Sequence, residues 1–493
     1  MLMIKRLFTY NLYIVSLLLL TQCGIPDIKN AIQENEAPRI FPDYTDIIIP
    51  PNIAPLNFKI EEEGNKYLVC IQGEHGNDIT FYQSSPEIKI NQKKWKALLA
   101  DNKGGNLLIE VSIRKEDNKW YHYLPITNKI ANETIDPYLY YRDIVPTNSL
   151  WNKMAMHQRD LESFREYKLF DNQRIDNNCM NCHTFNQNNP KEMLFHVRGN
   201  NGGTVIYKDG ELKKMSFPTL QAASTGAYCN WHPSGKIIAF AMNKIKQNYY
   251  LSGYGDKMKE VYDTESDIVF YDVENNQIFT DTLLTSANRE NLPAWSADGN
   301  HLYFITAPPY IINQPNEEIL YSLMQASYDI EANRIGNPEL LVSSGEIGGS
   351  ISFPTTSPDG KYMFFCVADF GYFPVNNKSA DLYLINLDTK EYYKPDINSN
   401  ESESYVTWSD NSRWAVFSSR RLDGMTSKPF VCHIDEHGKT SKPFIIPQKD
   451  PCYYKTDHRN FSRPELLTEK LDLTFSDLND IIFSAPITAK TPN

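Results

Sequence analysis

Four segments in the second half of the chain share one pattern, in which a polar turn leads into an apolar run. Aligned on His232, Ser296, Ser357 and Ser409, they cover residues 230–240, 294–304, 356–365 and 407–417. The turn of the third segment is Pro358-Asp359-Gly360, and these residue types supply the φ values of a tight turn. Further alternating strands follow each segment. Four strands at a period of about 50 to 60 residues predict a β-propeller, with a β-sandwich as the alternative.

The Trp295-Ser296-Ala297-Asp298-Gly299 core resembles the TolB-like (WD40-like) propeller repeat. The resemblance covers roughly residues 223–450 and weakens toward residue 484, where residues 480–484 are expected to form a closing strand. It implies an all-β fold. At the period of these repeats, residues 178–485 are long enough for about six blades, with five or seven as the alternatives.

The first 22 residues have the pattern of an export signal. Lys5 and Arg6 precede an apolar run that is too short to span a membrane. Leu20-Thr21-Gln22-Cys23-Gly24 resembles a lipobox, which implies that Cys23 is lipidated; a plain signal peptide with an incidental cysteine is the alternative. The residues after Cys23 carry neither a retention aspartate nor an acidic export stretch. We therefore expect an outer-membrane lipoprotein that faces the periplasm.

Cys179-Met180-Asn181-Cys182-His183 has the spacing of a c-type haem attachment motif. The two thiols can add to the vinyl groups on one edge of a porphyrin, and the adjacent His183 can bind the iron. A redox dithiol or half of a zinc site is the alternative, but neither a second pair of zinc ligands nor a surrounding βαβ pattern is evident. The sequence thus predicts one covalent haem c on Cys179 and Cys182, with His183 as the proximal ligand.

The sixth iron ligand is open at this stage. Met193 follows His183 by ten residues and is the first candidate, and His196 is the alternative. Met193 can equally be a core residue of a strand. Met154, Met156 and His157 precede the motif and are further candidates.

The haem motif falls where a blade is expected to begin. Residues 182–185 and 193–196 parallel the two strands of the later repeats, so a haem loop at 179–199 would replace the turn of the first blade. This arrangement resembles a group of exported TolB-like propeller lipoproteins that carry one CxxCH motif.

The rest of the chain divides by composition and by strand pattern. The expected N-terminal parts are a signal peptide at 1–22, a tether at 23–40 and a small β-sandwich domain at 41–125. A linker at 126–177 follows, and residues 160–167 within it are expected to form a short helix. The propeller at 178–485 and a tail at 486–493 complete the chain.

Three functions fit these features. Electron transfer to or from a protein partner leads, because a single haem with two protein ligands needs no substrate pocket. The alternative is a binding or assembly module with a sensory or structural haem; an enzyme is the third and has no catalytic motif in its favour. The net charge of −12 and the absence of glycine-rich phosphate loops exclude nucleic acid and nucleotide as expected partners.

Arg420 and Arg421 stand together after the last repeat strand. They could hold an anionic group, but a pair of salt bridges on the propeller rim is favoured. His232 and His433 are expected in a turn and a strand rather than as ligands.

Overall fold

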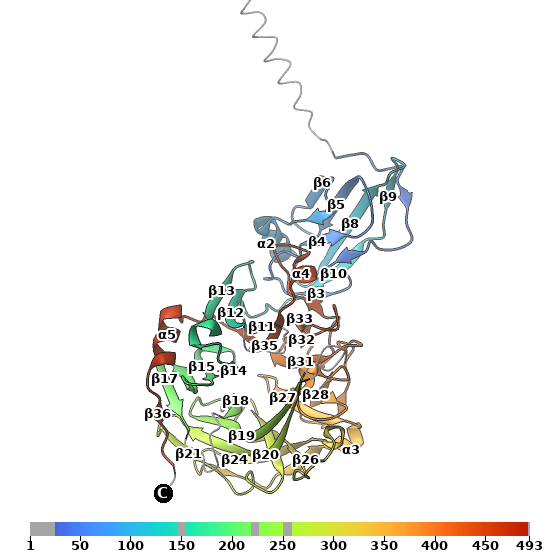
Figure 1. Cartoon of the computed structure of the whole chain (residues 1–493). Coiled ribbons are helices and arrows are strands. Elements are labelled where there is room, and N and C mark those ends of the chain that lie inside the picture. Colours follow the sequence, from blue (N-terminus) through green and yellow to red (C-terminus); the bar gives the residue numbers. More distant parts are fainter. Residues whose placement is uncertain (1–24, 146–152, 218–225, 250–258, 492–493) are drawn as a thin grey trace, which may run out of the picture.

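The computed structural model describes residues 25–145, 153–217, 226–249 and 259–491. Figure 1 shows a small N-terminal domain at one end and a ring of small sheets at the other. The chain is almost entirely β-structure, as the sequence predicts. Within the described ranges no helix is both long enough and apolar enough to cross a membrane. Cys23 lies outside the described residues.

The N-terminal domain packs two sheets and one helix around a shared core. Its larger sheet contains β1 (Ile32–Gln33), β3 (Ile48–Ile49), β5 (Lys66–Gln72), β6 (Ile79–Gln83), β8 (Asn106–Arg114), β9 (Trp120–His122) and β10 (Ile126–Ile130). The smaller sheet contains β2 (Ile40–Phe41), β4 (Phe58–Ile60) and β7 (Glu87–Ile88). The domain therefore begins before residue 41 and continues past residue 125.

A helix that the strand pattern did not predict, α2 (Gln92–Asp101), belongs to this domain. The side chain of Asn91 caps its first turn by accepting hydrogen bonds from the backbone of Lys93 and Lys94. Trp95 and Leu99 face the core from its buried side. The buried face of the helix thus joins the core that the two sheets share.

Among the described residues, six further sheets form the ring. Listed from the innermost strand outward, they are β35 (Asn460–Leu467), β11 (Tyr138–Ile144), β12 (Met154–Asp160), β13 (Glu166–Asp171); β14 (Met180–Asn186), β15 (Asn189–Val197), β16 (Gly203–Lys208), β17 (Glu211–Ser216), β36 (Ile487–Thr488); β18 (Ala227–Trp231), β19 (Ile237–Tyr249), β20 (Lys259–Asp272), β21 (Gln277–Phe279); β22 (Arg289–Trp295), β23 (His301–Ala307), β24 (Ser322–Asp329), β25 (Arg334–Ile335) with β26 (Glu339–Val342); β27 (Ser350–Thr356), β28 (Tyr362–Ala368), β29 (Asp381–Asn386), β30 (Tyr392–Tyr393); and β31 (Glu403–Trp408), β32 (Trp414–Ser419), β33 (Lys428–His433), β34 (Phe444–Ile445). The innermost strands contact one another in sequence around a closed ring. This arrangement is a β-propeller.

Short helices lie between the strands. They are η1 (Asn172–Ile175), η2 (Asn316–Glu318), α3 (Ser344–Ile347), η3 (Pro374–Asn376), α4 (Tyr453–Thr456) and α5 (Phe475–Phe483).

The ring is closed by β35, and not by the segment 480–484 that the sequence indicated. β35 pairs antiparallel with β11, so a strand from the C-terminal part completes the first sheet. Residues 475–483 form α5 instead, because Thr474 and Asp477 make a capping box and because Leu478 and Ile482 bury one helical face. The expected tail is also structured, since β36 pairs parallel with β17.

The prediction of a linker at 126–177 is wrong, because this segment forms strands. It contains β10 and three strands of the first sheet, so the propeller begins at Tyr138 and not at residue 178. The predicted helix near 160–167 is a tight turn between β12 and β13. Asp160 forms this turn by accepting hydrogen bonds from the Glu162 backbone at 2.9 Å and the Ser163 hydroxyl at 2.6 Å.

The repeat motif is confirmed as strand, turn and strand. In the third repeat the Ser357 hydroxyl donates to Asp359 at 2.6 Å and accepts from the Tyr362 backbone at 3.0 Å. Gly360 takes a φ of 72°, which explains glycine at that point of the turn. Ser296 with Asp298 and Ser409 with Asn411 repeat the 2.6 Å contact.

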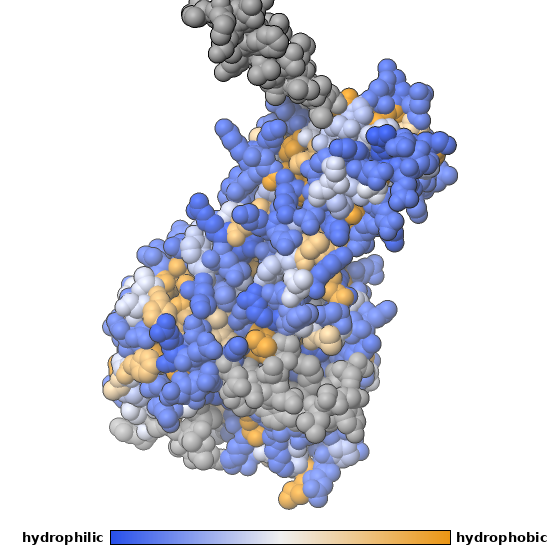
Figure 2. Space-filling view, turned by 45° about the horizontal axis from the view of Figure 1, so that its top comes forward, coloured by the Kyte–Doolittle hydropathy of each residue, from blue (hydrophilic) through white to orange (hydrophobic). Residues whose placement is uncertain are grey.

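The two parts of the molecule share one apolar core, which continues from the N-terminal sheets into the sheets of β27 and β31. Polar contacts border it. The Asn57 amide donates to the carbonyl of Lys449 at 3.0 Å, and Lys442 pairs with Asp43 at 2.7 Å. Figure 2 shows a mostly hydrophilic face on which apolar side chains gather only in small groups.

Candidate functional site

Each innermost strand of the ring carries a β-bulge at the same place. The residues at the six bulges have left-handed φ angles between 47° and 54°: Cys182, Tyr228, Leu292, Phe353, Tyr405 and Arg463. A shift in pairing register accompanies each of them. Non-glycine residues seldom adopt this conformation, and bulges re-aim the side chains that they carry. We call these six residues the bulge belt.

Three aromatic members of the bulge belt meet on the propeller axis. The rings of Phe353 and Tyr405 are 4.8 Å apart and those of Tyr228 and Phe353 are 5.8 Å apart, both edge to face. These three side chains and Arg463 border a cavity on either side of the belt. The belt therefore divides the propeller axis into two separate cavities.

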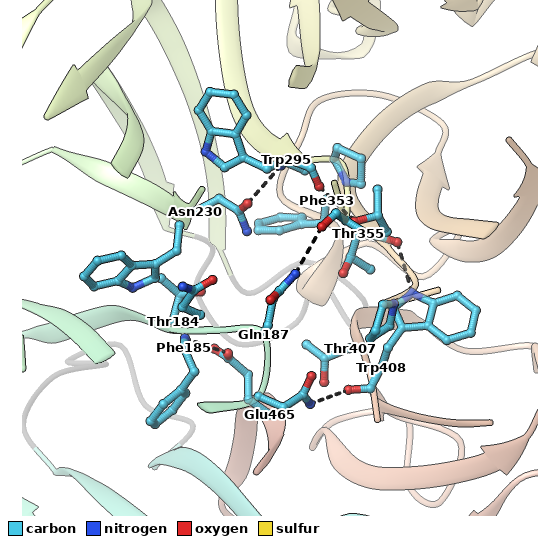
Figure 3. Close-up of a pocket in the computed structure, with 18 of the residues that line it drawn as sticks. Thr184, Phe185, Gln187, Asn230, Trp295, Phe353, Thr355, Thr407, Trp408 and Glu465 are labelled. Carbon is cyan, nitrogen blue, oxygen red and sulfur yellow. Dashed lines mark hydrogen bonds between the residues drawn. The ribbon is translucent and has the colours of Figure 1, made fainter. Parts of the chain in front are cut away.

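The first of these, the channel cavity, has a volume of about 160 Å³ and lies at the carboxyl ends of the innermost strands. Figure 3 shows Gln187, Asn230, Thr355, Thr407 and Glu465 around it. Most of the polar groups that line it form hydrogen bonds with neighbouring strands.

Hydrogen bonds around the channel cavity join each sheet to the next. Asn230 accepts from the Trp295 backbone at 2.9 Å, and the Trp408 indole donates to the Thr355 carbonyl at 3.1 Å. Thr407 donates to the Pro464 carbonyl at 2.7 Å. These bonds give the small channel cavity a structural part in closing the ring.

The second cavity, which we call the mouth cavity, lies at the amino ends of the innermost strands and has a volume of about 510 Å³. Its lining combines apolar residues such as Met154 and Phe373 with amides and with three arginines, Arg142, Arg198 and Arg463. A cavity of this size and composition suits a small organic ligand.

Cys179 and Cys182 both line the mouth cavity, whereas His183 lines neither cavity. Cys179 is half-buried just before β14, and Cys182 is buried at the bulge of that strand. His183 is only 3% exposed, and its Nε2 lies 2.8 Å from the carbonyl oxygen of Arg463. Its ring packs edge to face against Tyr140 at 4.6 Å. Burial, with Arg463 and Arg142 nearby, lowers the pKa of His183 well below its usual range, so the imidazole is neutral.

The two leading candidates for the sixth iron ligand lie on β15, and the further candidates Met154, Met156 and His157 lie on β12. Met193 is buried in an apolar cluster with Phe185 and Tyr207. His196 is buried as well, with Nδ1 2.8 Å from the Thr204 hydroxyl and Nε2 3.1 Å from the Cys229 sulfur. Neither residue lines the mouth cavity.

These positions fit the expected haem only in part. The two thiols share one cavity wall, as thioether attachment requires. The imidazole of His183 is hydrogen-bonded between β14 and β35. Neither Met193 nor His196 lines the cavity, and Met154 is the one sixth-ligand candidate that does. Iron ligation by His183 with Met193 or His196 stays a prediction.

The contacts of Arg421 favour a salt bridge over a role in holding an anionic ligand. Its guanidinium lies 3.1 Å from the buried carboxylate of Glu403 and 2.8 Å from the Ser419 hydroxyl. Arg421 thus forms a structural salt bridge with Glu403 in the sheet of β31. His232 lies in a turn, with Nε2 3.1 Å from the Gly299 carbonyl oxygen.

The bulge belt and Arg142 are functional candidates that no motif in the sequence marks. A signal for the belt is present, because each of Tyr228, Leu292, Phe353 and Tyr405 stands four residues before the aligned repeat position. Cys182 and Arg463 carry no such repeat signature and join the set only through the sheets. Arg142 lies in the segment 126–177, where the sequence pattern predicts a linker.

No protein-family model matches the chain, and no curated protein matches it either. Three solved structures show how distant the structural likenesses are. The first is a nidogen/laminin complex, with 7% identity, 68% of this chain and 99% of the other covered, and a TM-score of 0.38. The second is the Dos1 propeller, with 15% identity, coverage of 55% and 63%, and a TM-score of 0.34. The third is an auxiliary nutrient binding protein from Bacteroides thetaiotaomicron VPI-5482, with 10% identity, coverage of 80% and 96%, and a TM-score of 0.33.

Proposed function

We propose that this protein is a binding propeller of the cell envelope, and that its ligand occupies the mouth cavity. The observation that carries the proposal is the bulge belt, which closes one end of a cavity of about 510 Å³. A central channel closed in this way is a pocket that opens at one end only.

The lining supports a ligand with both apolar and polar parts. Val261, Phe353 and Phe373 offer apolar surface, and Asn177 and Asn178 add amide side chains to the lining. Such a mixture is typical of sites that bury the body of a small molecule and orient it through a few polar groups.

The place of the protein in the envelope belongs to the same proposal. A lipid on Cys23 would hold the chain at the periplasmic face of the outer membrane. In Figure 1 the N-terminal domain lies between the first described residues and the ring. The domain would thus separate the mouth cavity from the membrane surface.

Fluorescence of 8-anilinonaphthalene-1-sulfonate tests the site in the chain from residue 24 onward. Val375 lines the mouth cavity, so Val375→Trp should fill part of it and weaken the dye's binding at least tenfold. Leu340→Trp is the matched control, because Leu340 is 59% exposed on β26 of another sheet. Equal binding by both variants would exclude the mouth cavity as the site.

A monohaem electron carrier is the second candidate, and one observation favours it: Cys179 and Cys182 line the same cavity. Expression with a haem-attachment system should then give a reduced-minus-oxidised spectrum that Cys182→Ala changes and the buried Cys366→Ala does not. Comparing His183→Ala, Met193→Ala and His196→Ala would identify the axial ligands. A colourless chain under these conditions would exclude the candidate.

A further inference from the structure

The mouth cavity contains more positive than negative charge. Arg142, Arg198 and Arg463 line it, and Asp176 is the one acidic residue among its described lining residues.

Arg142 is the most deeply buried of the three arginines. It is 9% exposed, and its guanidinium donates to the Met180 carbonyl at 2.8 Å and the Ser462 hydroxyl at 3.3 Å. A further bond goes to the Asn181 amide oxygen at 2.5 Å. All of these acceptors are neutral, and Nε has no hydrogen-bond partner among the described residues.

Arg463 lies at the bulge of β35 and borders both cavities. Its Nη1 is buried, and within the described ranges it has no hydrogen-bond partner. The nearest carboxylate on its own strand, Glu465, lies on the channel side of the belt and accepts from the Phe185 backbone at 3.1 Å. Glu465 therefore belongs to the wall of the other cavity.

Buried guanidinium groups without carboxylate partners are costly, and proteins usually pair them with an anion. Their planar donors suit carboxylate, phosphate and sulfonate groups. Building on the binding function proposed above, we propose that the mouth cavity binds an amphiphilic organic anion whose acidic group contacts Arg463, Arg198 and Arg142. The apolar wall around Met154 and Phe373 takes the body of the ligand.

Two dyes with the same kind of aromatic body test this inference on the chain from residue 24 onward. The probes are 8-anilinonaphthalene-1-sulfonate, which is an anion, and N-phenyl-1-naphthylamine, which is neutral. The anion should bind at least tenfold more tightly. Arg463→Gln and Arg198→Gln should each weaken the anion about tenfold or more and leave the neutral dye within twofold. Arg334→Gln is the matched control, because Arg334 is exposed on β25 and does not line the mouth cavity.

Each outcome decides a different claim. If Val375→Trp blocks the anionic dye but the arginine variants bind it like the wild type, the binding site stands and the anion inference is overturned. If Val375→Trp has no effect, the proposed function fails first. Arg198 is partly exposed and follows the last residue of β15, so its variant should fold; matching melting curves would verify this. Inorganic phosphate and acetate, added as competitors, then show which acidic group displaces the dye.

Discussion

The Nε2 of His183 donates a hydrogen bond to the carbonyl oxygen of Arg463 over 2.8 Å, and so joins β14 to β35. The residues are 280 positions apart in the chain. They lie on the innermost strands of two adjoining sheets, at the point where the C-terminal part of the chain closes the ring. The histidine of the CxxCH motif is thus part of ring closure.

His183→Ala should lower the free energy of unfolding by about 2–3 kcal/mol in chain made without haem, because a buried carbonyl loses its donor and Tyr140 loses a packing partner. Urea denaturation measures the change. His437→Ala is the control, since that side chain is 82% exposed. Unchanged stability of His183→Ala would show that the contact does not support the ring.

The indole N–H of Trp408 should stabilise the fold through its hydrogen bond, in addition to the packing of its ring. Trp408→Phe breaks the bond to the Thr355 carbonyl, whereas the equivalent Trp295 has no partner for its indole nitrogen among the described residues. Trp408→Phe should therefore cost about 1 kcal/mol more than Trp295→Phe in denaturant melts. Equal losses would contradict the structural role given to the channel cavity.

Asp263 should make the protein less stable as the pH rises. Burial raises its pKa to about 7, although the Tyr372 hydroxyl at 2.8 Å and two asparagine amides bind it. The unfolded chain loses its proton near pH 4, so the destabilisation begins there and is complete above about pH 7. The stability of Asp263→Asn relative to wild type should improve by at least about 2 kcal/mol between pH 4 and pH 8.

Asp298→Asn gives the opposite sign and serves as the comparison. The hydrogen bond from Ser296 lowers the pKa of Asp298, so its contribution to stability is present above its unfolded pKa and is lost in acid. Parallel pH profiles for wild type and Asp263→Asn would rule out the titration assigned to Asp263.

Cys23→Ala should release the protein from the outer membrane or block its processing, because the lipid would be the only membrane attachment in the proposal. Fractionation of cells that express wild type and variant measures this. The half-buried Cys452 supplies the control variant, Cys452→Ala. If Cys23→Ala remains in the outer-membrane fraction as before, the lipobox interpretation is wrong.

Local chemistry explains what the sequence could predict of the fold. The Ser-x-Asp-Gly turns form their hydrogen bonds within a few residues, so the repeats disclosed the propeller. The closure by β35 depends on pairing with β11 from a distant part of the chain, and no local pattern marks it. Ile481, Ile482 and Phe483 are residue types that favour a strand, yet the segment forms a helix that begins with a capping box at Thr474.

The candidate site shows the same division. The CxxCH spacing identified Cys179 and Cys182, and both thiols line the mouth cavity. The orientation of His183 could not be predicted, because it is set by the bulge at Cys182 and by the carbonyl of Arg463. The three arginines of the cavity come from three separate strands or strand ends, so only the ring brings them together.

Protection of Cys179 from N-ethylmaleimide tests the central claim most directly, because this half-buried thiol lines the mouth cavity. Haem-free chain from residue 24 onward is labelled with and without saturating 8-anilinonaphthalene-1-sulfonate, and peptide mass spectrometry follows the rate at each cysteine. Cys452, also half-buried, reports on a distant loop. A ligand site in the mouth cavity predicts that the dye slows labelling of Cys179 at least tenfold and leaves Cys452 unchanged. Labelling of Cys179 at the same rate with the dye bound would contradict it.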